Sequence, residues 1–130
     1  MYLIFAGKIL LSLILGGVIG WQRQHIGKAA GFRTFALVSV GSTLFTLLSL
    51  EAFGSDISHI AAQIITGIGF IGAGTIIHKK DSVEGLTTAA GLWATASIGM
   101  AIGTGWYTQA LIATGVLFLI SIFPDKKYIK

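Results

Sequence analysis

The stretch IAAQIITGIGFIGAGTII, Ile60–Ile77, decides the fold class, because it is predominantly apolar and carries no charged residue. It holds four glycines: Gly67, Gly69, Gly72 and Gly74. Each glycine would cost about 1 kcal/mol relative to alanine inside a helix in water. In lipid the backbone must satisfy its hydrogen bonds within the segment, and small residues let neighbouring helices pack closely. The stretch therefore predicts a membrane-spanning helix.

The composition of the whole chain agrees with this interpretation. Hydrophobic residues make up 54% of the 130 residues and charged residues only 11%, whereas soluble domains carry about 25% charged residues. The mean hydropathy is +0.84. The chain has no cysteine, which excludes disulfides and thiolate metal sites. We predict an all-α membrane protein with a single domain over residues 1–130.

Five apolar segments predict a compact bundle of five transmembrane helices. Each is close to the roughly 20 residues that cross a hydrocarbon core of about 30 Å. We place the segments at residues 3–21, 34–53, 60–77, 86–103 and 106–123.

Charge placement predicts the orientation of the bundle. If five helices alternate in direction, the first loop, the third loop and the C-terminal tail lie on one side. These three regions contain the basic residues Arg23, Lys28, Arg33, Lys79, Lys80, Lys126, Lys127 and Lys130, while the second and fourth loops contain no lysine or arginine. Because basic loops stay in the cytoplasm, we predict an outside N-terminus, a cytoplasmic C-terminus and lipid headgroups facing the basic residues.

Two other interpretations of these features are disfavoured. The net charge of +4 does not predict nucleic-acid binding, because the basic residues lie at membrane boundaries and no groove-reading element accompanies them. The glycines of the third segment also match the pattern G-x-G-x-x-G. A dinucleotide site needs a preceding strand and a later acidic residue, and a transmembrane run offers neither. We predict no cofactor.

Helical spacing identifies three faces of small and polar residues, which we predict to turn inward and pack against each other. Those of the first segment are Lys8, Ser12, Gly16 and Gly20. Those of the third are Asp56, His59, Gln63, Gly67 and Gly74. Those of the fourth are Thr88, Gly91, Thr95, Gly99 and Gly103.

Charged residues near the membrane are candidate functional groups, because burying them is costly. We predict that Lys8 pairs with Asp56, with Glu51 as the second choice and a lysine that snorkels to the interface as the alternative. Arg33 could face a lipid phosphate, an anionic partner or Glu84, and the pair with Glu84 would be structural. Asp81 or Ser82 could cap the helix that follows.

Three blocks of the sequence carry a family resemblance. They are GWQRQHIGKAAGFRTFALVSVGS, DISHIAAQIITGIGFIGAGTII and GLTTAAGLWATASIGMAIGTG, and together they span most of the chain from Lys8 to about Gly105. In this order they resemble the signature blocks of the MgtC/SapB family of bacterial membrane proteins. The resemblance implies a location in the bacterial inner membrane, with multiple spans.

The resemblance also points to individual residues. The family has a basic residue where Lys8 stands. It shares a run matching Gly85–Ala90, which includes Thr87 and Thr88, and the residues that match Arg23, Arg33, Asp56, Gln63, Gly67, Gly69, Gly72 and Gly74. Two positions depart from the family pattern: Gln22 stands where many relatives have glutamate, and His59 where many have arginine. The well-known virulence-associated members add a soluble cytoplasmic domain, which has no counterpart within these 130 residues.

The resemblance implies a role in adaptation to low magnesium. Our first hypothesis is a regulatory module that binds another membrane protein, such as ATP synthase. The alternative is a small transporter or channel for Mg²⁺ or another cation, with Glu51 and Asp56 as weak candidate ligands, although Mg²⁺ dehydrates reluctantly and Lys8 would oppose it. No constellation of residues predicts an enzyme. The glycine-rich faces predict a homo-oligomer, with a dimer favoured.

Overall fold

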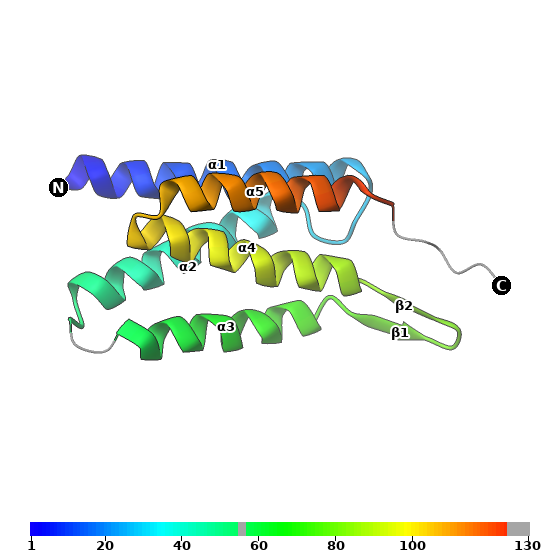
Figure 1. Cartoon of the computed structure of the whole chain (residues 1–130). Coiled ribbons are helices and arrows are strands. Elements are labelled where there is room, and N and C mark those ends of the chain that lie inside the picture. Colours follow the sequence, from blue (N-terminus) through cyan, green and yellow to red (C-terminus); the bar gives the residue numbers. More distant parts are fainter. Residues whose placement is uncertain (55–56, 125–130) are drawn as a thin grey trace.

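The computed structural model describes residues 1–54 and 57–124, which form five helices and one antiparallel hairpin (Figure 1). The helices are α1 (Tyr2–His25), α2 (Phe32–Glu51), α3 (Ile57–Ala73), α4 (Leu86–Thr104) and α5 (Tyr107–Ile122). The strands β1 (Ile77–Lys79) and β2 (Ser82–Glu84) join α3 to α4. Consecutive helices run side by side in opposite directions, so the fold is an up-and-down bundle.

The two ends of the bundle differ in what connects the helices. The hairpin, the α1–α2 connection and the last turn of α5 lie at one end, which we call the hairpin end (Figure 1). The N-terminus and the α4–α5 connection lie at the opposite end. Four basic residues therefore lie at the hairpin end. Arg23 is in the last turns of α1, Lys28 is in the α1–α2 connection, and Lys79 and Lys80 are in the hairpin.

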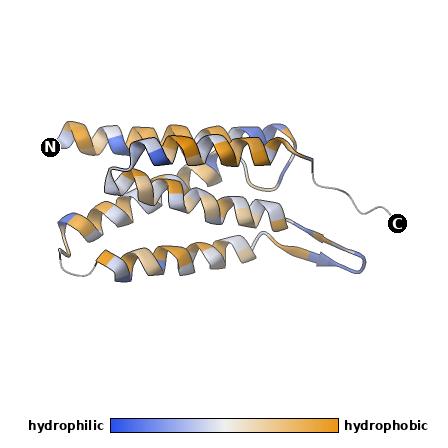
Figure 2. Cartoon of the chain, viewed as in Figure 1, coloured by the Kyte–Doolittle hydropathy of each residue, from blue (hydrophilic) through white to orange (hydrophobic). Residues whose placement is uncertain are grey.

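Figure 2 shows mostly apolar residues along the helices, and polar colour is strongest at the hairpin and near helix ends. Large apolar side chains are exposed on every helix, most of them on α1, α2, α3 and α5, whereas many serines and threonines are buried. The helices α1, α2 and α4 are long and apolar enough to cross a membrane. The helices α3 and α5 are apolar but shorter, with 17 and 16 residues. This arrangement is that of a membrane protein, in which the surface meets lipid.

The centre of the bundle is formed by α4, which contacts each of the other four helices. Its side chains Leu92, Ile98 and Ile102 are fully buried and join Phe35 of α2 and Ile19 of α1 in one core.

Glycines set the close approach of these central helices. A Cβ atom added at Gly16 of α1 would lie 2.5 Å from the Cβ of Ser39 on α2. One added at Gly99 of α4 would overlap the Ser39 carbonyl oxygen and lie 2.7 Å from the Cβ of Ser42. Only glycine fits at these contacts, which bring the helix backbones together as in other membrane bundles.

The C-terminal boundary predicted for the third segment is wrong. Helix α3 ends at Ala73, and Ile77 already belongs to β1, so residues 74–77 lie outside the helix. The amide of Thr75 donates to the Gly72 carbonyl at 3.0 Å, and its hydroxyl donates to the same oxygen at 2.8 Å. These local bonds turn the chain into the hairpin, in which Ile77 lies opposite Glu84. The hairpin itself was not predicted.

Candidate functional site

A set of buried hydroxyl side chains lies among α1, α2 and α4, and we call it the polar seam. Its members are each at most 2% exposed: Ser12, Ser39, Thr43, Thr88 and Thr95. The hydroxyl of Thr95 donates to the Gly91 carbonyl at 2.7 Å, one turn earlier in its own helix. The Oγ1 of Thr43 lies 3.0 Å from the Ser39 carbonyl and 2.9 Å from that of Gly99, which joins α2 to α4. Such bonds satisfy hydroxyls in the absence of water.

Lys8 lies toward the N-terminal end of α1 and is partly buried. Its Nζ donates to the carbonyl oxygen of Gly103, in the last turn of α4, at 2.8 Å. Free carbonyls and the negative end of the helix dipole make a helix C-terminus a favourable place for a cation. The predicted partner Asp56 lies outside the described residues, and in the described part of the chain no ion pair joins Lys8 to Glu51.

Arg23 lies near the C-terminal end of α1, and its side chain is only 3% exposed. Its Nη2 donates to the hydroxyl of Thr88, in the first turns of α4, at 2.9 Å. A buried hydrogen bond from a charged donor typically contributes about 1.5–3 kcal/mol. Arg23 therefore fastens α1 to the start of α4 at the hairpin end of the polar seam.

Gln22 extends this polar contact to α5. Its Nε2 donates to the Ser121 carbonyl at 3.1 Å, while its buried Oε1 accepts no hydrogen bond from the residues that the structure describes. The amide can make the bond to Ser121 because it carries donor hydrogens, which an ionised glutamate at this position would lack. This departure from the family pattern thus has a structural consequence in the chain.

We expect Thr88→Val to lower the free energy of unfolding by about 2 kcal/mol. Valine keeps the shape of threonine but removes the oxygen that accepts from Arg23, so a buried charged donor loses an acceptor. The measurement is denaturant unfolding in mixed micelles. The control is Thr66→Val on α3, whose hydroxyl is exposed and, among the described residues, donates only to the Ala62 carbonyl one turn earlier. Equal effects of the two substitutions would contradict the role of the Arg23 contact.

The remaining predictions for residues at the hairpin end turn out differently. Arg33 is exposed at the start of α2 and does not pair with Glu84 in the part of the chain that the structure describes. Glu84 instead pairs with Lys79 across the hairpin at 2.6 Å, an exposed contact of small energetic value. Neither Asp81 nor Ser82 caps α4, because the N-cap residue is Gly85 and it has no side-chain cap. Thr87 is half-buried in the first turn of α4.

Helix α3 turns its predicted inner face outward, so that prediction is wrong for the single chain. Its buried residues are Ile64, Ile68 and Gly72, whereas His59, Gln63, Gly67 and Gly74 are exposed. Gly72 packs on α4, where an added Cβ would lie 3.4 Å from the Ala89 carbonyl oxygen. Added Cβ atoms at Gly67 and Gly69 would meet nothing within 4 Å. On α4, Gly91 does pack inward, 3.4 Å from the ring of Phe35 by the same measure.

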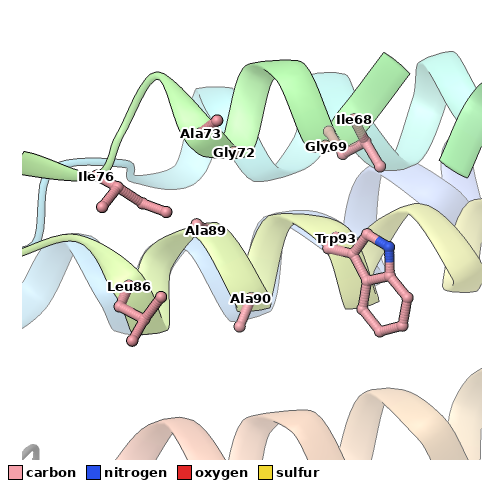
Figure 3. Close-up of a pocket in the computed structure, with 9 residues that line it drawn as sticks. All are labelled: Ile68, Gly69, Gly72, Ala73, Ile76, Leu86, Ala89, Ala90 and Trp93. Carbon is pink, nitrogen blue, oxygen red and sulfur yellow. The ribbon is translucent and has the colours of Figure 1, made fainter. Parts of the chain in front are cut away.

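An apolar groove of about 340 Å³ runs between α3 and α4 (Figure 3). The glycines of α3 leave it open, and the ring of Trp93 lies at one end of it. Its lining residues are Ile68, Gly69, Gly72, Ala73, Ile76, Leu86, Ala89, Ala90 and Trp93. These side chains offer hydrocarbon contacts and no charged group, so the groove suits a lipid chain or an apolar side chain.

The metal-ligand candidates are not gathered into a site. Glu51 is exposed at the end of α2 and borders a second apolar groove with Phe5 and Phe45. Asp56 falls outside the described residues. Within residues 1–54 and 57–124 no three histidine, aspartate or glutamate side chains come close enough to hold a metal ion.

Sequence reasoning missed the hydroxyls that α2 contributes to the polar seam and its neighbourhood. A signal was present, because Ser39 and Thr43, and likewise Ser42 and Thr46, are four residues apart and so share a helix face. All four are buried in the structure.

Comparison with known proteins identifies relatives over nearly all of this chain. It is 44% identical over 125 residues to the protein named "Putative magnesium transporter YhiD" of Escherichia coli K12, a match covering 89% of this chain and 58% of the relative. It is 43% identical over 115 residues to Protein MgtC of Salmonella typhimurium LT2, covering 88% of this chain and 50% of the relative.

The chain thus spans little more than half the length of these curated relatives. No solved structure shows a significant match to it. The sequence matches the MgtC family over residues 9–127, which is most of its length. The chain therefore belongs to the MgtC family.

Proposed function

We propose that the chain crosses the bacterial inner membrane five times, with its N-terminus outside and the hairpin end in the cytoplasm. The helices α3 and α5 lie alongside the three longer helices (Figure 1). At 1.5 Å per residue they are about 25 Å long, a mismatch that local thinning of the bilayer can absorb. The concentration of basic residues at the hairpin end supports the orientation.

Within that membrane we propose a regulatory, non-enzymatic role in adaptation to low magnesium. The observation that carries the proposal is the polar seam with a cation near each end, although the buried Ser39 Oγ has no hydrogen-bond partner among the described residues. The hydroxyls of Thr43 and Thr95 are bonded to backbone carbonyls, and close glycine contacts fill the space between the helices. Lys8 and Arg23 stand at opposite ends of α1. A cation passing along this route would meet two positive charges.

A regulator that does not itself conduct an ion must act by binding another protein. The apolar helix surface that remains after the bundle has packed offers contact area to another membrane protein. We propose ATP synthase as that partner, as the family resemblance implies. The relatives named MgtC and YhiD support the connection with magnesium.

The alternative function is transport of Mg²⁺ or another cation. The name of YhiD favours it, as does the exposed carboxylate of Glu51 at the end of α2 opposite the hairpin.

Three measurements separate these functions. We expect purified chain in proteoliposomes to give Mg²⁺ flux no greater than empty liposomes, and tagged chain to copurify with ATP synthase from native membranes. Inverted membrane vesicles should then show reduced ATP-driven proton pumping when the chain is present. Flux that Asp56→Asn abolishes and Lys8→Met leaves intact would make the chain a transporter and overturn the proposal. Absence of both flux and copurification would remove ATP synthase as the partner.

A further inference from the structure

The second apolar groove, of about 400 Å³, lies along the second half of α2, and we call it the Glu51 groove. It extends along α2 from Gly41 to Ala52, and Phe5 of α1 also borders it. The start of α1 and the end of α2 lie together at the end of the bundle opposite the hairpin (Figure 1). The lining is apolar apart from Glu51, whose side chain is exposed. One end of the groove therefore carries a carboxylate, and the rest offers hydrocarbon contacts.

The electrostatic surroundings of Glu51 favour a cation. Glu51 is the last residue of α2, and the last turn of α2 contains no basic residue. The carbonyl end of a helix carries a partial negative charge, to which a carboxylate adds its own. Lys8 lies toward the same end of the bundle, but its Nζ donates to the Gly103 carbonyl, and among the described residues it forms no ion pair with Glu51. The negative charge at the end of the groove therefore suits a cation from outside the chain.

The shape of the Glu51 groove fits a hydrocarbon chain better than a helix. Between Gly41 and Ala52 the axis of α2 rises roughly 16 Å, at about 1.5 Å per residue. A volume of 400 Å³ spread over that length gives a cross-section of roughly 25 Å², whereas a helix about 10 Å across occupies roughly 80 Å². Such a groove is about 5 Å wide, which suits a single chain of carbon atoms that contact their neighbours at about 3.5–4.0 Å.

The carboxylate and the groove follow each other in the order of a lipid molecule. Glu51 lies at the end of α2, whereas Gly41 lies in its interior and leaves the inner part of the groove open, because an added Cβ would meet nothing within 4 Å. An acyl chain in the groove would extend from the membrane boundary into the bilayer, with its headgroup beside Glu51. A primary ammonium in that headgroup supplies both a positive charge and the N–H donors that a carboxylate accepts.

We propose that the Glu51 groove binds a phospholipid whose headgroup ends in a primary ammonium, with one acyl chain along α2 and the ammonium at the Glu51 carboxylate. The proposal rests on the membrane-spanning arrangement proposed above and not on the regulatory role. Failure of that arrangement would be seen separately, as chain that alkaline carbonate extracts from membranes.

Native mass spectrometry of the full chain tests the headgroup contact, with phosphatidylethanolamine and phosphatidylglycerol of the same acyl chains supplied in equal amounts. Only the first carries an ammonium. We expect about fivefold more bound phosphatidylethanolamine for the wild type and equal binding of the two lipids by Glu51→Gln. The matched control is Asp81→Asn, which removes an exposed carboxylate in the hairpin and should keep the wild-type preference. Equal binding by the wild type, or an unchanged preference in Glu51→Gln, would overturn the proposal.

A charge reversal gives a readout that loss of structure would not produce. Glu51→Lys should bind phosphatidylglycerol in preference to phosphatidylethanolamine, because the ammonium is then on the protein and the lipid supplies the net negative charge. A preference of Glu51→Lys for phosphatidylethanolamine would contradict the contact.

Gly41→Leu tests the acyl-chain part of the groove. The leucine should take the place of part of the chain and lower phosphatidylethanolamine binding about tenfold. Gly115→Leu on α5 is the matched control, because Gly115 is also open and lies outside the groove, and it should bind as the wild type does. Circular dichroism checks that both variants keep the fold. Lipid binding unchanged by Gly41→Leu would overturn the proposal. So would a dimer or a bound protein, in place of lipid, that Gly41→Leu removes, because a protein would then cover the groove.

Discussion

Gly99→Leu is expected to separate α4 from α2 and to lower the free energy of unfolding by about 3 kcal/mol or more. The new side chain would begin inside the space of the Ser39 carbonyl oxygen and 2.7 Å from the Cβ of Ser42. Neither obstacle is a flexible side-chain end, so the helices themselves must move apart. The movement would break the 2.9 Å contact between Thr43 Oγ1 and the Gly99 carbonyl, and it would loosen the buried core around Ile98.

Gly115→Leu is the matched control for this experiment. Gly115 lies in the interior of α5, and an added Cβ would meet nothing within 4 Å. Leucine has a higher helix propensity than glycine, so this variant should be as stable as the wild type or slightly more stable. Unfolding in mixed micelles, followed by circular dichroism, measures both. An unfolding midpoint for Gly99→Leu equal to that of the wild type would contradict the packing described here.

The helical character of the bundle could be predicted because hydrophobic length and charge spacing are local properties of a sequence. The fourth segment shows that the spacing of small residues can also predict which face of a helix is buried. Its predicted inward residues Gly91, Thr95 and Gly99 do lie against the other central helices or within the core. They could be identified because the same face carries both glycines and hydroxyls, and hydroxyls gain hydrogen bonds by turning inward.

Helix α3 shows why periodicity alone could not predict the buried face of every helix. Spacing places Gln63, Gly67 and Gly74 on one face but does not say whether a helix of the same chain covers it. In water a polar face points outward, whereas in lipid both the inner and the outer faces can be apolar or small. The outcome depended on the position of α4, which buries Ile68 and Gly72 instead.

Lys8 and the hairpin illustrate a second limit. Reasoning from side chains alone does not identify the contacts that backbone groups make. The sequence favours a carboxylate partner for Lys8, and the structure adds a backbone acceptor, since Nζ donates to the carbonyl of Gly103 at a helix end. The favoured partner Asp56 lies outside the described residues. The strands of the hairpin are only three residues each, and all of these residues are exposed, so neither hydrophobic alternation nor length predicted them.

Gly85→Ala is expected to lower the free energy of unfolding by about 3 kcal/mol, because two costs add at this position. Gly85 has a φ of +83°, a left-handed conformation that costs other residues about 1–2 kcal/mol. An added Cβ would also overlap the Thr75 carbonyl oxygen and lie 2.8 Å from the carbonyl carbon. The clash should displace Gly85, whose own carbonyl accepts the bond from Ala89 that begins α4.

Gly27→Ala separates these two costs. Gly27 has a similar φ of +75°, but an added Cβ there would meet nothing within 4 Å, so only the cost of about 1–2 kcal/mol for conformation should appear. Unfolding in mixed micelles gives the two values, and amide hydrogen exchange should be faster in the hairpin and the first turn of α4 for Gly85→Ala alone. Because Thr88 in that region accepts from Arg23, the disturbance should reach the hairpin end of α1 as well. Equal losses of stability in the two variants would show that only the left-handed conformation matters and that the Thr75 carbonyl does not exclude a Cβ at Gly85.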